Sequence, residues 1–139
     1  MIDSFQGEYR WLSNFWRCDV VLDNKTYPTV EHAYQASKTL DIKERCRIAS
    51  LPTPGDTKRA GRNVKLRPDW DQVKLSIMEN LVRQKFTNNL ILKKRLLDTG
   101  SQEIQEGNAW NDTFWGVCRG QGQNNLGKII MKIRDELRQ

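Results

Sequence analysis

Apolar and polar residues alternate with the period of a β-strand early in the chain. The alternation covers residues 17–22, and Asp23-Asn24-Lys25 then supplies polar residues suited to a turn. Residues 25–27 return as a short second strand, which we expect Pro28 to end because proline lacks a backbone donor. The pattern therefore predicts a β-hairpin near the N-terminus.

Beyond the hairpin, apolar residues recur every three or four positions, as they do on one face of a helix. Residues typical of helix N-caps precede several of these stretches. Helices are predicted after Thr29, near Ile42, after Thr53, after Asp69, near Asn89 and after the glycine-rich segment 120–128. The buried stripe of the helix after Asp69 is expected to contain Trp70, Val73, Ile77 and Leu81, and that of the last helix Leu126, Ile129, Ile130, Ile133 and Leu137. Residues 103–107 are predicted to form a further short strand. The expected fold is predominantly α (α+β), a single domain over residues 1–139 with a small N-terminal β-hairpin.

The charge of the chain favours an anionic partner. Its formal net charge is +6 and its pI is near 9.4, which suits nucleic acid or a phosphorylated metabolite. The alternative is a mildly basic surface without a partner. No apolar run is long enough to cross a membrane, and residues 1–5 do not resemble a signal peptide, so we expect a cytoplasmic protein.

Histidine and cysteine are too few for several kinds of site. His32 is the only histidine, and Cys18, Cys46 and Cys118 lie far apart in the sequence. This pattern supports neither a metal site nor a Cys-His or Ser-His nucleophile, and we expect no metal and no cofactor. Acid–base chemistry would then depend on carboxylates, tyrosines or lysines.

The segment Tyr27–Lys38 contains the most informative residues. Helical spacing places Glu31, Tyr34 or Gln35, and Lys38 along one face of the helix that follows Thr29. A carboxylate, an aromatic or amide group and a cation in one row suit a reactive site. The alternative is that Glu31 only complements the helix dipole and that Lys38 is solvated.

Other candidate residues have a structural alternative of equal weight. Lys58 and Arg62 could bind a phosphate or form a solvated basic face. Gly122 and Asn124 belong to a glycine-rich turn before a helix, which can offer backbone N–H groups to an anion, although such turns are common. Trp70 could be a core residue or a pocket wall.

Several segments in order resemble the NADAR (YbiA-like) family. The central one is Tyr27–Lys38, and the others span nearly the whole chain. They are Leu12-Ser13-Asn14-Phe15, Lys58-x-x-Gly61-Arg62, Asp69-Trp70-Asp71, Lys85-Phe86-Thr87-Asn88, Asp112-Thr113-Phe114-Trp115-Gly116 and Asn124-Asn125-Leu126-Gly127. Val117 and Cys118 follow the Trp-Gly pair, where some members carry an acidic residue.

The resemblance implies a mainly α-helical fold and N-glycosidase activity on a phosphorylated ribosyl or ADP-ribosyl substrate. Two substrates are associated with the family: ribosylamino-pyrimidine phosphates of riboflavin synthesis, and ADP-ribosylated guanine in nucleic acid. By position, Glu31 matches the catalytic acidic residue, and Trp70 and Trp115 match the pocket tryptophans. Asp112 matches the acidic residue before the second tryptophan, where it could assist catalysis or only hold a loop.

The remaining predicted residues concern substrate binding. Lys38, Lys58 and Arg62, with backbone groups near Gly122 and Asn124, are candidates for the phosphate end. Asn14 is a candidate for a ribose hydroxyl, and Phe15 beside it is a candidate substrate-binding residue. Two alternatives to an enzyme are a non-catalytic module that binds ADP-ribose or nucleotides, and a basic nucleic-acid-binding module, for which no reading motif is present.

Overall fold

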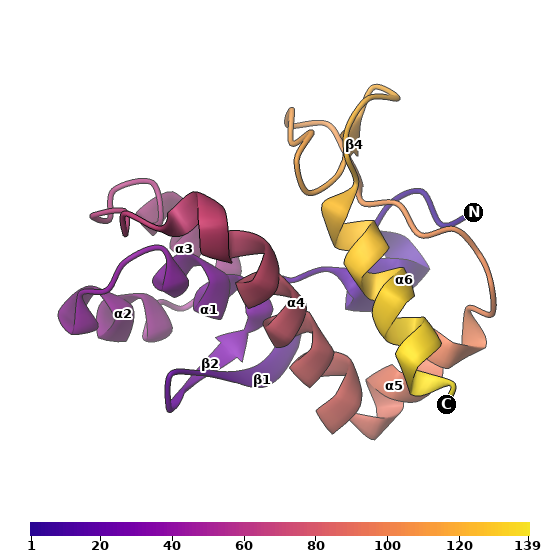
Figure 1. Ribbon diagram of the computed structural model, residues 1–139, viewed down its shortest axis with the longest axis horizontal. Coiled ribbons are helices and arrows are strands. Elements are labelled where there is room, and N and C mark those ends of the chain that lie inside the picture. Colours follow the sequence, from indigo (N-terminus) through magenta and orange to yellow (C-terminus); the bar gives the residue numbers. More distant parts are fainter. The chain divides into compact units, whose positions relative to one another are not determined.

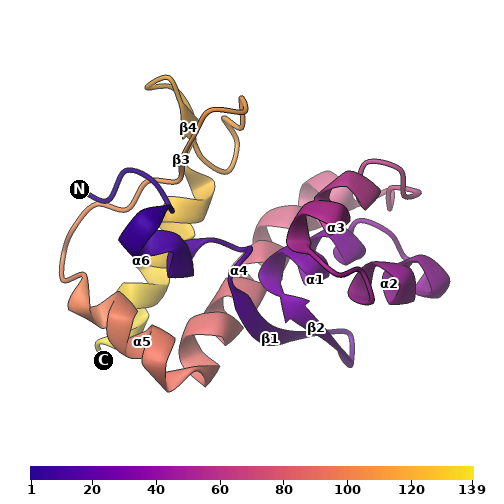
Figure 2. The same cartoon turned by 180° about the vertical axis from the view of Figure 1, so that it is seen from behind.

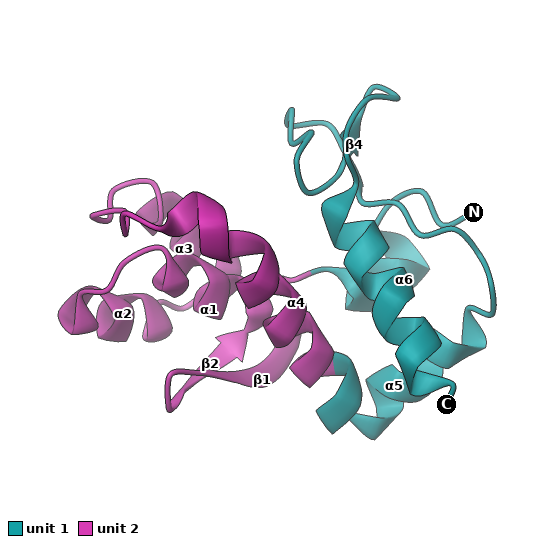
Figure 3. Cartoon of the chain, viewed as in Figure 1, with its two compact units in different colours: residues 1–13, 86–139 teal, residues 14–85 magenta.

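The computed structural model describes all 139 residues and is predominantly helical, as predicted. The chain divides into two compact units, residues 14–85 (unit 2) and residues 1–13 with 86–139 (unit 1), which are drawn in different colours in Figure 3. Each unit is described by itself below. No helix in the structure is both long and apolar enough to cross a membrane.

Unit 2 opens with the predicted hairpin. Strands β1 (Arg17–Leu22) and β2 (Lys25–Thr29) pair antiparallel, and Asp23 and Asn24 turn with positive φ. The expectation that Pro28 ends the second strand was wrong, because β2 continues to Thr29. The pairing of the two strands is irregular between Arg17 and Val20, which is the part of β1 opposite Pro28. A proline is tolerated there, because no regular hydrogen bond between the strands depends on the N–H that it lacks.

Helix α1 (Val30–Ser37) is the central element of unit 2 and contacts the hairpin, α2 (Ile42–Ala49) and α3 (Pro54–Ala60) (Figures 1 and 2). Thr29 caps it as predicted, accepting a hydrogen bond from the backbone N–H of His32. All eight residues of α1 are buried, including its polar ones. The sequence indicated only one apolar face, so the burial of the polar face is a result of the tertiary structure.

At the start of α3, Thr53 is the N-cap as predicted, and Pro54 occupies the first helical position. Helix α4 (Trp70–Asn88) begins directly after Asp69 and reaches from unit 2 into unit 1. Apolar residues on its buried side include Met78, Leu81, Val82 and Phe86, whereas Val73 and Ile77 of the predicted stripe are only half-buried. Lys85 lies on the same buried side, which the apolar pattern did not predict.

Helices α5 (Leu90–Asp98) and α6 (Asn125–Leu137) pack against each other in unit 1. The predicted stripe of α6 is buried at Leu126, Ile129, Ile130 and Ile133. Arg134 is buried beside this stripe and donates a hydrogen bond to Thr99 Oγ1 over 3.0 Å. The contact joins the C-cap of α5 to the last turn of α6.

The remaining elements of unit 1 are short. A 3₁₀ helix (Gly7–Leu12), not predicted, places Trp11 edge-on against Phe86, with ring centroids 6.3 Å apart. The strand predicted over 103–107 was wrong for most of its length, because only Ile104, in a bridge to Ile2, and Gly107, in a two-residue strand, form β pairs there. The observed strands are β3 (Gly107–Asn108) and β4 (Val117–Cys118), which pair parallel. The positions of these strands depend on pairing between segments far apart in the chain, which the strand propensity of the local sequence does not predict.

Candidate functional site

Glu31 lies in the first turn of α1 and is almost fully buried, with 7% of its surface exposed. Its Oε1 accepts a hydrogen bond of 2.7 Å from Nε2 of Gln35, one helical turn further on. A carboxylate that only complemented a helix dipole would lie in solvent. The burial of Glu31 and its hydrogen bond to Gln35 are instead features expected of a functional carboxylate.

Aromatic rings and a cation continue the row that begins at Glu31. Tyr34 contacts Trp70 at the start of α4, with ring centroids 5.3 Å apart and planes tilted by 53°. The ammonium group of Lys38 lies 5.7 Å from the centroid of the Tyr34 ring, within cation–π range. The predicted face of Glu31, Tyr34 or Gln35, and Lys38 therefore exists, and Trp70 joins it from another helix.

Positive charge surrounds the end of this row. Burial lowers the pKa of the Lys38 ammonium, Glu31 acts in the opposite direction, and the cations of Arg62, Lys58 and Lys74 lower it further. The structure thus places two of the predicted phosphate ligands, Lys58 and Arg62, within electrostatic reach of the third, Lys38. Lys74, on α4, adds a fourth cation that the sequence analysis did not select.

Asn14 and Phe15 precede the hairpin of unit 2. The carbonyl of Asn14 accepts the backbone N–H of Glu31 over 3.1 Å, and its side-chain amide lies 3.5 Å from the sulfur of Met78. Asn14 is therefore tied to the first turn of α1. Phe15 is 44% exposed, so its ring is accessible to solvent. A contact of Asn14 with a ribose hydroxyl and a part for Phe15 in substrate binding remain predictions.

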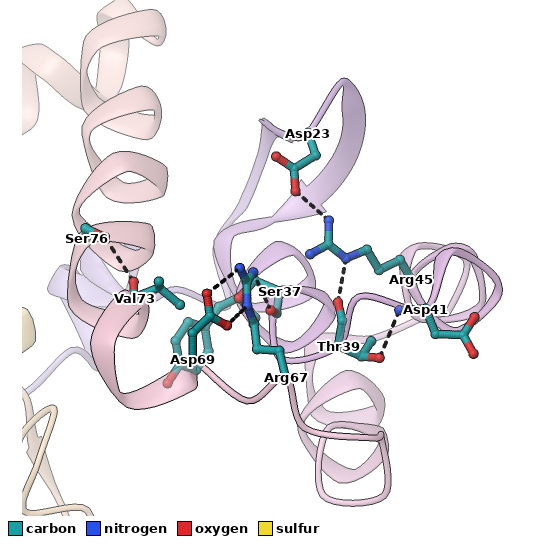
Figure 4. A network of polar contacts seen from close by, with 10 residues as sticks. Asp23, Ser37, Thr39, Asp41, Arg45, Arg67, Asp69, Val73 and Ser76 are labelled. Carbon is teal, nitrogen blue, oxygen red and sulfur yellow. Dashed lines mark hydrogen bonds and ion pairs between the residues drawn. The ribbon is translucent and has the colours of Figure 1, made fainter.

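Arg67 joins the C-terminal end of α1 to the start of α4, as Figure 4 shows. Its backbone N–H donates to the carbonyl of Lys38 over 2.7 Å. Its guanidinium donates to the Asp69 carboxylate over 2.6 Å and 3.1 Å, and to the carbonyl of Ser37 over 3.5 Å. These contacts hold Lys38 and Trp70 on neighbouring elements, so Arg67 is a structural support of the site.

We expect Arg67→Gln to lower the melting temperature by roughly 3 to 6 °C at neutral pH, because it removes charge-assisted hydrogen bonds. The hydrogen bond from Arg67 is the main cause that lowers the pKa of the Asp69 carboxyl. A carboxyl with a lowered pKa stabilises the fold above its ordinary value of 3.8, and this contribution disappears as the pH falls through the lowered value. The difference between parent and variant should therefore shrink in acid, which melting curves between pH 2 and pH 7 would measure.

Arg47→Gln is the matched control for this prediction. Arg47 makes an ion pair with Glu44 three residues earlier on α2, and both side chains are exposed. Exposed pairs of this kind contribute little to stability. An equal loss of melting temperature in both variants would show that the contacts of Arg67 have no special weight.

Asp112 and Trp115 lie in a loop of unit 1. Oδ1 of Asp112 accepts the backbone N–H groups of Phe114 and Trp115 over 3.2 Å and 2.9 Å. Asn108 bonds both backbone groups of Asp112 with its side-chain amide. The carboxylate of Asp112 thus shapes the turn that carries Trp115, one of the two roles considered for it. A catalytic part for Asp112 and a pocket role for Trp115 stay predictions.

Gly122 and Asn124 belong to the segment that leads into α6. Gly122 has a φ of +149°, and a Cβ there would lie 3.0 Å from Cα of Val117, so this position favours glycine. The amide of Asn124 donates to the carbonyl of Ile104 and accepts the N–H of Glu106. Backbone N–H groups 123–126 donate to carbonyls 113–116. These hydrogen bonds stabilise the conformation of the segment, and anion binding here stays a prediction.

Three residues with a clear place around Glu31 were missed or left undecided by the sequence analysis. Gln35 was only an alternative to Tyr34, although its position four residues after Glu31 allows a side-chain hydrogen bond. Lys74 is one helical turn after Trp70 and was not considered. Arg67 had no signal, because its contacts with Ser37 and Lys38 depend on the tertiary fold.

Fold and site together describe a small, mainly helical protein with one buried carboxylate near paired aromatic rings and several cations. A family model for the NADAR domain matches residues 3–138. The chain is 36% identical over 137 residues to N-glycosidase YbiA of Escherichia coli, covering 96% of this chain and 85% of that protein. The chain belongs to the NADAR family.

Two further relatives and one solved structure agree with this assignment. An N-glycosidase of Nostoc punctiforme is 36% identical over 136 residues, covering 94% of this chain and 86% of that protein. A riboflavin biosynthesis protein of Vibrio vulnificus is 33% identical over 132 residues, covering 93% of this chain and 36% of that protein. The NMR structure of Escherichia coli YbiA matches with a TM-score of 0.85 and 35% identity, covering 99% of this chain and 87% of that one.

Proposed function

We propose that this protein is an N-glycosidase that hydrolyses the bond between a ribose and a base in a phosphorylated substrate. The enzyme class, a hydrolase acting on N-glycosyl bonds, is that of its NADAR relatives. The observation that supports it in this chain is the buried Glu31 carboxylate, with Lys38 and three further cations nearby.

Breaking a ribose–base bond creates positive charge at the anomeric carbon and negative charge on the departing base. A carboxylate beside the anomeric carbon stabilises the first charge and can orient and deprotonate the attacking water. Glycosidases acting on O-glycosides use carboxylates in the same way. We assign this role to Glu31, because it is the buried carboxylate of α1.

The cations suit the phosphate of such a substrate. Lys58, Arg62 and Lys74 each act electrostatically on the Lys38 ammonium, which Glu31 also influences. Binding a phosphate would offset the mutual repulsion of these groups. The exposed parts of Tyr34 and Trp70 are small, so their main contribution is to the shape of the site.

Two substrates fit this proposal. Relatives named riboflavin biosynthesis proteins, in Vibrio vulnificus and Zea mays, favour a ribosylamino-pyrimidine phosphate. The net charge of +6 is also compatible with ADP-ribosylated guanine in nucleic acid, whose backbone is anionic, although it suits either anionic substrate. A non-catalytic module that binds ADP-ribose or nucleotides is the alternative function, and hydrolysis of any ribosylated base would exclude it.

The test is to incubate the protein separately with a guanine-ADP-ribosylated oligonucleotide and with the ribosylamino-pyrimidine phosphate. Mass spectrometry would follow both reactions, with Glu31→Gln as the blank. Release of ADP-ribose from the oligonucleotide alone identifies a de-ADP-ribosylating enzyme, and cleavage of the pyrimidine alone identifies a metabolic N-glycosidase. If neither substrate is cut, binding of ADP-ribose without turnover becomes the better account.

A further inference from the structure

The side chain of Gln35 makes its hydrogen bond to Glu31 inside the protein. Nε2 of Gln35 lies 2.7 Å from Oε1 of Glu31, and only 4% of Gln35 is exposed. Both residues are on α1, separated by one turn, so the helix itself sets the geometry of the pair. An amide N–H donates more strongly to an ionised carboxylate than to a neutral carboxyl group.

Helix α3 holds the Gln35 side chain against this carboxylate. Gly61, the C-cap of α3, lies so close that a Cβ there would be 2.8 Å from Cδ of Gln35 and would overlap its Oε1. Gly61 has a φ of −61°, which any residue adopts. A side chain at this position would have to displace the Gln35 amide, so the space that Gln35 occupies, and not the backbone, favours glycine here.

The other end of the same amide makes no hydrogen bond. Oε1 of Gln35 is buried and has no partner. Leaving a buried acceptor without a partner costs free energy, which a leucine or methionine of similar size would avoid. The reverse orientation of the amide would turn Oε1 toward Glu31, where it would repel an ionised carboxylate. The contact with Glu31 therefore determines how Gln35 is oriented.

We propose that Gln35 is a positioning residue, which keeps the Glu31 carboxylate ionised and in one orientation for the hydrolytic reaction. The inference rests on the catalytic role proposed for Glu31. Gln35 acts through Glu31 and needs no contact with substrate. Gly61 contributes indirectly, because its missing side chain leaves room for the amide.

Other charged groups lie on α1 and on the elements around it. Most are cations, and several are already paired. Lys38 ends α1 itself, Lys58 comes from α3, Arg62 follows α3, Lys74 comes from α4, Arg45 of α2 pairs with Asp23 of the hairpin, and Arg67 pairs with Asp69. Substitutions at Gln35 leave all of them in place, so a change in pH dependence reports on the amide.

The test compares the parent with Gln35→Met, which keeps the length of the side chain and removes the donor. We expect kcat to fall by about 10- to 100-fold with KM changed less than about threefold. The acidic limb of the kcat profile should move to higher pH, because the carboxylate loses the hydrogen bond that favours its charged form. Gly61→Ala, which displaces the amide, should change kcat and the profile in the same direction.

A double variant separates action through Glu31 from a general structural effect. If Gln35 works through Glu31, adding Gln35→Met to Glu31→Gln should cause no further loss of kcat. Gln72→Met, an exposed glutamine near the start of α4, is the matched control and should keep the parent kcat and pH profile.

A readout without substrate keeps the inference independent of the reaction. Carbon-13 NMR of the Glu31 carboxyl should show its titration at higher pH in Gln35→Met than in the parent. Unchanged titration together with a parent-like kcat profile in Gln35→Met would overturn the positioning role. Loss of the proposed function is distinguishable, because Glu31→Gln would then keep the activity of the parent, or the parent would cleave neither substrate.

Discussion

Glu31→Gln is expected to lower kcat by about 10³-fold, within the range of roughly 10²- to 10⁴-fold typical of a missing general acid or base. The substitution changes one oxygen to an amide group and keeps the size of the side chain. Its remaining oxygen can still accept the hydrogen bond that Gln35 donates, so the packing of α1 should survive. We expect the melting temperature to stay within about 3 °C of the parent.

The measurement combines turnover of the identified substrate with a thermal melt of the same sample. Glu44→Gln is the control, since Glu44 is an acidic residue of α2 that pairs with Arg47 on the surface. It should leave kcat unchanged. A Glu31→Gln protein that melts far below the parent would indicate that Glu31 is structural, and one that turns over at the parental rate would exclude it from catalysis.

Lys85→Met is expected to stabilise the protein below pH 7 and to lose this advantage as the pH rises. Lys85 is 1% exposed, and burial lowers the pKa of its ammonium from 10.5 to about 7. A lysine with a lowered pKa binds fewer protons in the folded than in the unfolded state between these two values. The stability of the parent, relative to the variant, should therefore increase between pH 7 and 10.5.

The size of the stability difference between parent and variant follows from the ordinary and the lowered pKa of Lys85. A fall from 10.5 to about 7 corresponds to about 5 kcal/mol at most, since one pH unit is worth 1.36 kcal/mol. Methionine fills a similar volume without a charge, so the variant escapes the cost of burying an ammonium group. Urea unfolding at several pH values between 6 and 10 would measure the difference.

Lys43→Met is the control for the buried lysine. Lys43 is exposed on α2, so its replacement should change stability by less than about 0.5 kcal/mol at every pH. If Lys85→Met follows the pH dependence of the parent, the Lys85 ammonium is not penalised by its burial.

Most helices could be predicted because their signals are local. Thr29 and Thr53 accept backbone N–H groups of the first turn, as caps do wherever they occur. The stripe of α6 is buried where its spacing predicted. Residues 103–107 could not be placed in the same way. A parallel pair of two-residue strands and a bridge from Ile2 to Ile104 depend on segments far apart in the chain.

The candidate site was predictable to a smaller degree. Glu31 could be selected because a helix face and a family motif both indicated it, and the structure shows its burial. The partner of Glu31 was less certain, since Tyr34 and Gln35 both fit the spacing. Arg67 was not predictable, because a loop arginine is placed against the carbonyls of Ser37 and Lys38 only after the chain folds.

The sequence by itself determined where the helices and hairpin lie and which family the chain resembles, because caps, apolar spacing and ordered motifs act over a few residues. Only the tertiary structure decided that every residue of α1 is buried and that Gly61 makes room for the amide of Gln35. It also buried Lys85 on the apolar side of α4. Burial depends on the elements that cover a residue, and local sequence does not specify them.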